Sequence, residues 1–187
     1  PTQGGYLNVQ PISTYSATVG YGWLGGVASG FDRATVSGPN AALIRDGHWA
    51  GSGGGARTFQ LDLPPGSYEV TLTMGDTYAR DKMNVSVVAG TGTGLTNVTT
   101  AAGQWVTRSF TASPDGSGQL QLRFSDGGGD PYWVVSGIAV QTSATVGTLT
   151  VSGPGGSLTA GLSRRAKSKV GVASGCSVDV AAGLVNG

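Results

Sequence analysis

Apolar and polar residues alternate along much of the first 142 residues, most regularly between Phe59 and Asp76. Apolar side chains occupy every second position from Phe59 to Leu63 and again from Tyr68 to Met74. A period of two over this length predicts two strands, each with one buried and one wet face. Pro64–Gly66 lies between them and cannot continue a strand, so we expect a hairpin that turns at this corner. Because a two-stranded hairpin is not stable alone in water, other strands must cover its apolar row.

Further short segments with strand character follow one another at intervals of roughly ten residues, as in antiparallel sandwiches. We expect a turn at Thr91–Gly94. The pattern predicts an all-β fold, an antiparallel β-sandwich of the jelly-roll kind. The predicted strands are Tyr6–Val9, a short one that begins at Ala41 and ends in the turn signal Arg45–Gly47, Met83–Val88, Leu95–Thr99, Gln104–Ala112, Gln119–Phe124 and Tyr132–Val140.

The composition changes after Gln141. All 14 aromatic residues lie at or before Trp133, and residues 143–187 contain none. A stretch of this size without large side chains buries too little apolar surface to fold by itself. We therefore predict a β-sandwich at residues 1–142, followed at 143–187 by a Gly/Ser/Ala-rich linker, an extended C-terminal arm or the start of a following domain.

Charge and the length of the apolar runs argue against two classes of protein, those that bind nucleic acid and those that span a membrane. Charged residues make up 11% of the chain, and the four basic residues after Ser143 lie in a Gly/Ser/Ala-rich tail, which is not a nucleic-acid footprint. No apolar run is long enough to span a membrane. Cys176 is the single cysteine, which is compatible with any compartment. The chain begins at Pro1 without a methionine, so we expect a processed or excised piece.

Two motifs resemble a known family. The pattern G-x-Y-x-V-x-L-x-x-G-D at Gly66–Asp76, followed by G-D-P-Y-W-V-V-S-G-I-A-V at Gly129–Val140, resembles the galactose-binding-like β-sandwiches. It looks most like the malectin-type and accessory carbohydrate-binding modules of bacterial polysaccharide-degrading enzymes. Ser136 stands where the closing strand of that family commonly has Asn. The resemblance implies a non-catalytic sugar-binding role, often with a structural calcium ion.

Aromatic and polar residues in Gly-rich segments are the candidates for sugar contact. An aromatic face can cover the apolar face of a pyranose, while charged or amide groups bind its hydroxyls. For Trp23 and Trp133 the alternative is a place in the core of the sandwich, whereas Trp49 is expected in a loop. The candidate carbohydrate-binding residues are Tyr21, Trp23, Arg45, His48, Trp49, Asp76, Tyr78, Tyr132 and Trp133.

Three aspartates are candidates for a calcium site. Asp126 and Asp130 flank three glycines, which would let backbone carbonyls converge on an ion, and Asp46 is a further candidate. Ca²⁺ takes six to eight oxygen ligands, several of them carbonyls. A simple turn is the alternative for this loop, which does not have the EF-hand pattern.

Catalysis has weaker support. Gly75-Asp76-Thr77 resembles the Gly-Asp-Ser opening of SGNH esterases, but Thr replaces the nucleophile and His48 is the single histidine. A glycosidase would need Asp76 paired with Asp126 or Asp130 in one cleft. A lyase could use Tyr78 or Tyr132 with Arg80 or Lys82.

The leading hypothesis is a secreted or cell-surface module that binds a polysaccharide, as an accessory to an enzyme rather than an enzyme itself. One alternative is a structural or adhesive unit of an extracellular assembly, in which residues 143–187 contact a neighbouring domain or copy. The second alternative is a small polysaccharide lyase or esterase.

Overall fold

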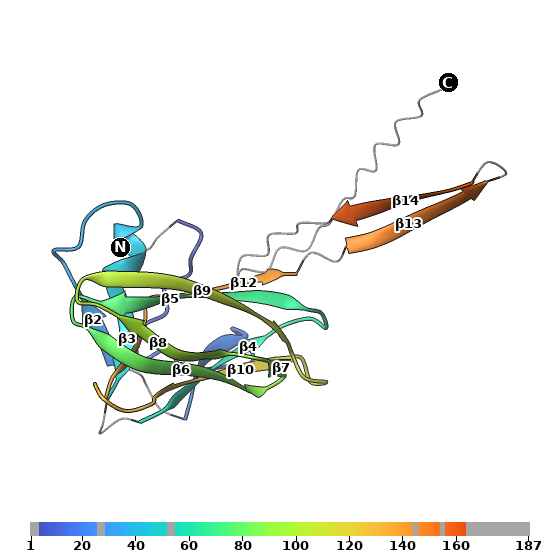
Figure 1. Cartoon of the computed structure of the whole chain (residues 1–187). Coiled ribbons are helices and arrows are strands. Elements are labelled where there is room, and N and C mark those ends of the chain that lie inside the picture. Colours follow the sequence, from blue (N-terminus) through green and yellow to red (C-terminus); the bar gives the residue numbers. More distant parts are fainter. Residues whose placement is uncertain (1–3, 26–28, 52–54, 144–145, 154–155, 164–187) are drawn as a thin grey trace.

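The computed structural model of the chain describes residues 4–25, 29–51, 55–143, 146–153 and 156–163 (Figure 1). Strands dominate this part, and the one short helix is α1 (Ala41–Ile44). The strands are β1 (Tyr21–Leu24), β2 (Ser29–Asp32), β3 (Asp46–Ala50), β4 (Arg57–Asp62), β5 (Tyr68–Asp76), β6 (Arg80–Ala89), β7 (Thr91–Gly92), β8 (Leu95–Thr100), β9 (Gln104–Ser113), β10 (Gln119–Asp126), β11 (Trp133–Val135), β12 (Gly137–Thr142), β13 (Val146–Gly153) and β14 (Gly156–Ser163).

Two antiparallel sheets form the body of the molecule. One has the strand order β1-β4-β10-β6-β8 and the other β12-β5-β9-β7. Figure 1 shows them as two layers, with β5 and β9 in one and β6, β8 and β10 in the other. Apolar side chains from both sheets make one buried cluster, in which Val70, Leu72 and Leu122 are fully buried. The predicted antiparallel β-sandwich is confirmed.

A third, smaller sheet has the order β11-β3-β2. Its register places Trp49 opposite Ser29 and Val134, while the preceding residue, His48, lies opposite Gly30 and Val135. Since successive side chains of a strand point to opposite faces, β3 presents His48 and Trp49 to different sides of this sheet.

The two strands predicted between Phe59 and Asp76 are confirmed as β4 and β5, but the expected hairpin is wrong. β4 belongs to the five-stranded sheet and β5 to the four-stranded sheet, so the chain crosses between layers at Pro64–Gly66. The Tyr68 hydroxyl donates a hydrogen bond to the Pro64 carbonyl at 2.8 Å and holds this corner. A period of two identifies a strand but not the sheet to which it belongs.

Several other predictions need correction. The short strand expected from Ala41 to the turn at Arg45–Gly47 is instead the helix α1, which follows Asn40 in a left-handed conformation (φ 65°). Trp49 lies within β3 rather than in a loop. Tyr132–Val140 divides at Ser136, whose amide donates to the Thr73 carbonyl, so its halves join different sheets as β11 and β12. The segment at Tyr6–Val9 forms no strand, and the turn expected at Thr91–Gly94 contains the short strand β7.

The segment after residue 142 contains strands that the sequence analysis did not assign. β13 and β14 pair antiparallel from Val146↔Ser163 to Gly153↔Gly156 in a separate two-stranded sheet. Figure 1 shows this sheet beyond the end of β12. The division at residues 142 and 143 stays a prediction, and residues 164–187 lie outside the described residues.

Candidate functional site

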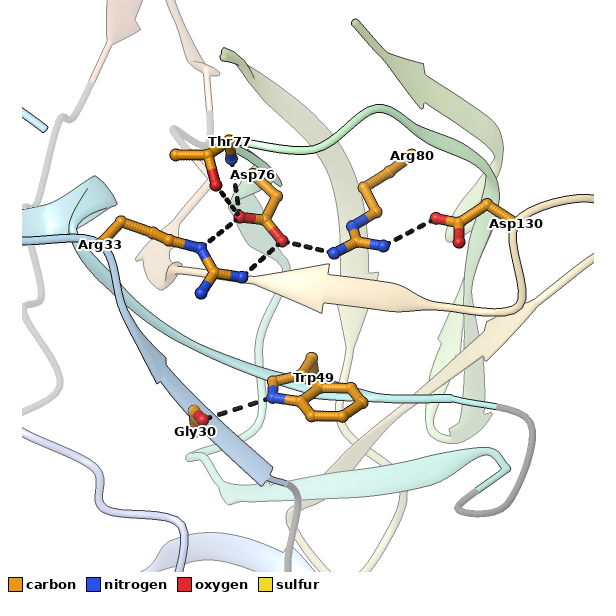
Figure 2. A network of polar contacts seen from close by, with 7 residues as sticks. All are labelled: Gly30, Arg33, Trp49, Asp76, Thr77, Arg80 and Asp130. Carbon is orange, nitrogen blue, oxygen red and sulfur yellow. Dashed lines mark hydrogen bonds and ion pairs between the residues drawn. The ribbon is translucent and has the colours of Figure 1, made fainter. Parts of the chain in front are cut away.

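The carboxylate of Asp76, at the end of β5, is the centre of a polar network (Figure 2). Its side chain is fully buried, yet it meets two guanidinium groups. Arg33 donates to both carboxylate oxygens, Nε to Oδ1 at 2.7 Å and an Nη to Oδ2 at 3.0 Å. Arg80 donates to Oδ2 at 2.6 Å. A buried carboxylate with bidentate and charge-assisted hydrogen bonds is fixed in position, and it fixes both arginines in turn.

The local sequence Gly75-Asp76-Thr77 explains how the carboxylate reaches this position. Gly75 has φ 138°, and a Cβ there would lie 2.2 Å from the Gln104 carbonyl oxygen, so the position requires glycine. The backbone N–H of Thr77 donates to Asp76 Oδ1 at 2.6 Å, and its hydroxyl donates at 3.1 Å. Burial raises the pKa of Asp76, but the hydrogen bonds from Arg33, Arg80 and Thr77 outweigh burial and lower that pKa to about 2.

A second carboxylate completes the network. Arg80 donates from its other Nη to Asp130 Oδ2 at 2.9 Å, and the Asp130 amide donates to Asp81 Oδ1 at 2.8 Å. Gly129 has φ 96°, and a Cβ there would lie 2.3 Å from the Asp81 carboxylate, so glycine lets the loop after β10 close onto Asp81. We call Arg33, Asp76, Arg80 and Asp130 the arginine–aspartate network. Its two positive and two negative charges balance.

Aromatic rings cover the guanidinium groups of this network. The Tyr78 ring centroid lies 5.4 Å from Arg33 Cζ and 5.6 Å from Arg80 Cζ. Tyr132 lies 5.1 Å from Arg80 Cζ, and Phe31 lies 4.6 Å from Arg33 Cζ. These distances are within the range of cation–π attraction. Tyr78 is nevertheless 62% exposed, so it presents a ring to solvent over a fixed base.

Trp49 extends this aromatic group. Its ring is 5.4 Å from that of Tyr132 in an edge-to-face arrangement, and its Nε1 donates to the Gly30 carbonyl at 3.3 Å (Figure 2). A Cβ at Gly51 would lie 2.1 Å from the Tyr132 ring, so glycine there makes room for Tyr132. We call Trp49, Tyr78 and Tyr132 the aromatic platform. Three of the predicted carbohydrate-binding residues thus adjoin a fourth, Asp76, through the two arginines.

The other predicted aromatic residues lie elsewhere. Trp23 and Trp133 are each 1% exposed, and their ring centroids lie 5.7 Å apart beside Phe124. Both tryptophans therefore lie in the core, which is the alternative that the sequence left open for them. Tyr21 and His48 line a cavity together with Trp23. Contact of any of these residues with a sugar stays a prediction.

The imidazole ring of His48 forms a hydrogen bond with a core residue. Its Nδ1 accepts a hydrogen bond from Trp23 Nε1 at 2.9 Å. Burial lowers the pKa of His48, and a backbone hydrogen bond with Val9 partly opposes that shift. In the described part of the chain no hydrogen bond joins His48 to Asp76 or Thr77. Thr77 and His48 therefore do not form the nucleophile and base pair that the Gly75-Asp76-Thr77 motif would need.

Arg45 forms a second ion pair, which is more exposed. It donates to both carboxylate oxygens of Asp32, at 2.6 and 2.7 Å, and its Nε lies 3.8 Å from an Asp46 oxygen. The Asp32 side chain is 54% exposed. Arg45 thus holds the turn between α1 and β3 against the end of β2.

The three predicted calcium ligands have different neighbours. Asp46 lies near Arg45, Asp130 binds Arg80, and Asp126 Oδ2 accepts from the Gly128 amide at 2.7 Å. No cluster of three or more His, Cys, Asp or Glu residues that could hold a metal ion occurs among the described residues. Asp126 Oδ1 is buried without a hydrogen-bond partner in that part of the chain, so it is the oxygen that a cation would satisfy. The calcium site stays a prediction.

The sequence did not point to Arg33 as a site residue, and it placed Arg80 at the end of a candidate binding loop, Asp76–Arg80, without assigning it a contact with the sugar. The spacing of four residues between Asp76 and Arg80 could have suggested that the two side chains meet. Asp76 ends β5 and Arg80 begins β6, however, so this spacing does not follow from one regular element. Arg33 lies 43 residues before Asp76, so no local sequence pattern pairs the two residues.

The described residues form no helix that is both long and apolar enough to cross a membrane.

Comparisons with known proteins agree with this fold. Residues 1–141 match the family described as "Beta-agarase/YXIM esterase-like, galactose-binding domain-like". Over 99 residues the chain is 42% identical to Beta-agarase A of Zobellia galactanivorans, a match that covers 52% of this chain and 18% of that protein. The chain therefore spans less than a fifth of the length of this relative.

A solved structure has the same architecture. The chain is similar to protein YXIM of Bacillus subtilis, with a TM-score of 0.55 and 22% identity over 76% of this chain and 37% of that one. It also aligns with TmCBM61, solved in complex with beta-1,4-galactotriose, with a TM-score of 0.36 and 15% identity over 65% of this chain and 88% of that one. Because the family match extends over three quarters of the sequence, the chain belongs to the beta-agarase/YXIM esterase-like, galactose-binding domain-like family.

Proposed function

We propose that this domain is a non-catalytic module that binds a galactose-containing polysaccharide through the aromatic platform. The observation that carries the proposal is the exposed ring of Tyr78, which is held over the guanidinium groups of Arg33 and Arg80. A ring fixed before binding loses little conformational entropy when a sugar stacks on it. Family membership supports galactose as the sugar, and the similarity to a beta-agarase makes agarose the first polysaccharide to test.

The state of Asp76 favours binding over catalysis. A general acid at neutral pH needs a raised pKa, whereas the pKa of Asp76 is lowered to about 2. Both of its oxygens already accept hydrogen bonds from arginines. The carboxylate is therefore neither a proton donor nor a free nucleophile at neutral pH. Its role is to hold the arginines on which Tyr78 rests.

The balanced charge of the network indicates an uncharged ligand. Arg33 and Arg80 are compensated by Asp76 and Asp130, so this network offers no excess positive charge to an anionic polysaccharide. Binding should then depend little on salt concentration. As an accessory module for a polysaccharide, the domain would act outside the cell.

The test uses affinity electrophoresis in agarose-containing gels and titration calorimetry with agarose oligosaccharides. Tyr78→Ala should weaken binding at least about tenfold, as truncation of a central aromatic contact does, whereas Tyr78→Phe keeps the ring and should bind nearly as the parent does. Val88→Ala, an exposed apolar residue on β6, serves as the control. Binding by Tyr78→Ala equal to that of the parent would place the ligand elsewhere.

A further inference from the structure

A cavity of about 750 Å³ lies at one edge of the sandwich. It is lined by residues of β1 and β12, which are edge strands of the two main sheets, and by residues 4–11 of the N-terminal segment. Its volume falls within the range of about 300–1,000 Å³ found for pockets that hold small ligands. The cavity therefore has room for a short oligosaccharide.

This cavity is separate from the aromatic platform. Among the described residues that line it are His48 and Asp46, but none of the arginine–aspartate network and none of the platform. The separation follows from β3, because His48 and Trp49 are successive residues and point to opposite faces of the small sheet. One strand thus forms part of the wall of two different sites.

The lining suits a ligand with an apolar ring face and no charge. Among the lining residues, the rings of Tyr6, Tyr21 and Phe31 are half-buried and can meet a ligand, whereas Trp23 and Phe59 are buried. The carboxylates of Asp32 and Asp46 lie at the same cavity. No Lys or Arg is among the described lining residues, so an anion would find no partner there. A cation is disfavoured because the Arg45 guanidinium already holds Asp32 and lies near Asp46.

Unused hydrogen-bonding groups point to a hydroxyl-rich ligand. Ser136 lines the cavity, and its Oγ is buried without a hydrogen-bond partner in the described part of the chain. An isolated buried hydroxyl is costly unless a ligand or water satisfies it. Residues 137–141 of β12 also line the cavity, and an edge strand leaves half of its backbone N–H and C=O groups without a strand partner.

We propose that this cavity is a second carbohydrate site, which takes a neutral sugar unit such as the end of a glycan chain. Apolar rings would cover one face of the sugar, while Ser136 Oγ, the β12 backbone and the two carboxylates bind its hydroxyls. The identity of the ligand as a sugar rests on the proposed function, but the cavity and its unpaired hydroxyl do not.

The single histidine is a built-in probe of the cavity. Because His48 lines it and accepts the Trp23 indole hydrogen bond, the His48 imidazole and Trp23 Nε1–H resonances should shift when a ligand enters. The experiment titrates the full chain with D-galactose and with a neutral agarose disaccharide, and follows these resonances by NMR. Saturable shifts at His48 and Trp23 support the site. Unchanged resonances at the solubility limit of both sugars overturn it.

Two variants and a control establish where the sugar binds. Ile138→Trp places bulk in the lining and should abolish the shifts, while Val88→Trp adds the same ring on β6, away from the cavity, and should not. Ser136→Ala should weaken binding about two- to tenfold through loss of one hydrogen bond, a readout that remains if Ile138→Trp fails to fold. Shifts that persist in a folded Ile138→Trp, or full affinity in Ser136→Ala, would refute the cavity site.

Failure of this inference is distinguishable from failure of the proposed function. Polymer binding that Tyr78→Ala abolishes, together with unchanged His48 resonances, would keep the platform and eliminate the cavity. Sugar-dependent His48 shifts in a chain that does not bind agarose would keep the cavity and eliminate the platform.

Discussion

Replacing the buried carboxylate tests whether the arginine–aspartate network stabilises the fold. In Asp76→Asn the side chain keeps its size but loses the charge that holds Arg33 and Arg80. The pKa of Asp76 is about 2 against an ordinary value of 3.8, which corresponds to about 2 kcal/mol at neutral pH. Breaking a buried ion pair costs about 3–5 kcal/mol. We expect the free energy of unfolding to fall by about 2–4 kcal/mol, measured by urea denaturation.

The matched control is Asp32→Asn. Asp32 also binds an arginine through both oxygens, but its side chain is 54% exposed. An exposed pair of this kind contributes about 0–1 kcal/mol. The two variants remove the same chemical group and differ in burial. Equal losses in stability would refute the argument that burial gives the Asp76 network its strength.

The pH dependence provides an independent readout. Because folding lowers the pKa of Asp76, its contribution is fully present above its ordinary pKa and is lost as pH falls from about 4 towards 2. The parent should therefore lose about 2 kcal/mol more than Asp76→Asn across this range. Parallel stability curves for the parent and Asp76→Asn would show that Asp76 titrates alike in the folded and unfolded chains.

Three further predictions concern stability. Burial lowers the pKa of His48, so the parent should lose stability as pH falls below about 6.5, and His48→Gln should lack this slope in chemical denaturation. Gly75→Ala should lower the free energy of unfolding by several kcal/mol, because the new Cβ would overlap the Gln104 carbonyl. Gly103 has φ 73° but open space around it, so Gly103→Ala should cost only about 1 kcal/mol. Similar melting temperatures for the two variants would contradict the steric argument. If Ca²⁺ binds at Asp126, its addition to chelator-treated protein should raise the melting temperature of the parent but not of Asp126→Asn, and an unchanged parent would remove the predicted metal site.

Local patterns predicted the strands well because the period of two depends only on neighbouring residues. Thus β4, β5, β9 and β10 lie close to their expected positions. The pattern could not show that β4 and β5 belong to different layers, since a strand buries alternate residues in either sheet. Nor could it show the break at Ser136, where apolar residues continue on both sides.

The candidate site was less predictable because burial and pairing are long-range properties. Trp23 and Tyr78 both lie in segments rich in glycine or turn residues, yet one is 1% exposed and the other 62%. Contacts with Phe59, Phe124 and Trp133 decide the position of Trp23, and all three are remote in sequence. The galactose-binding-like resemblance was confirmed, but it did not identify Arg33, whose partner lies 43 residues away.

The network joins parts of the molecule that no backbone ladder connects directly. Asp76 ends a strand of the four-stranded sheet, Arg80 begins one in the five-stranded sheet, and Arg33 directly follows β2 of the small sheet. One buried carboxylate therefore fixes the meeting point of three sheets, and Tyr78 lies two residues after it. In the proposed function the charges have a structural role and the rings contact the ligand. Loss of Asp76 should therefore weaken glycan binding through displacement of Tyr78, whereas loss of the Tyr78 ring should leave the fold intact.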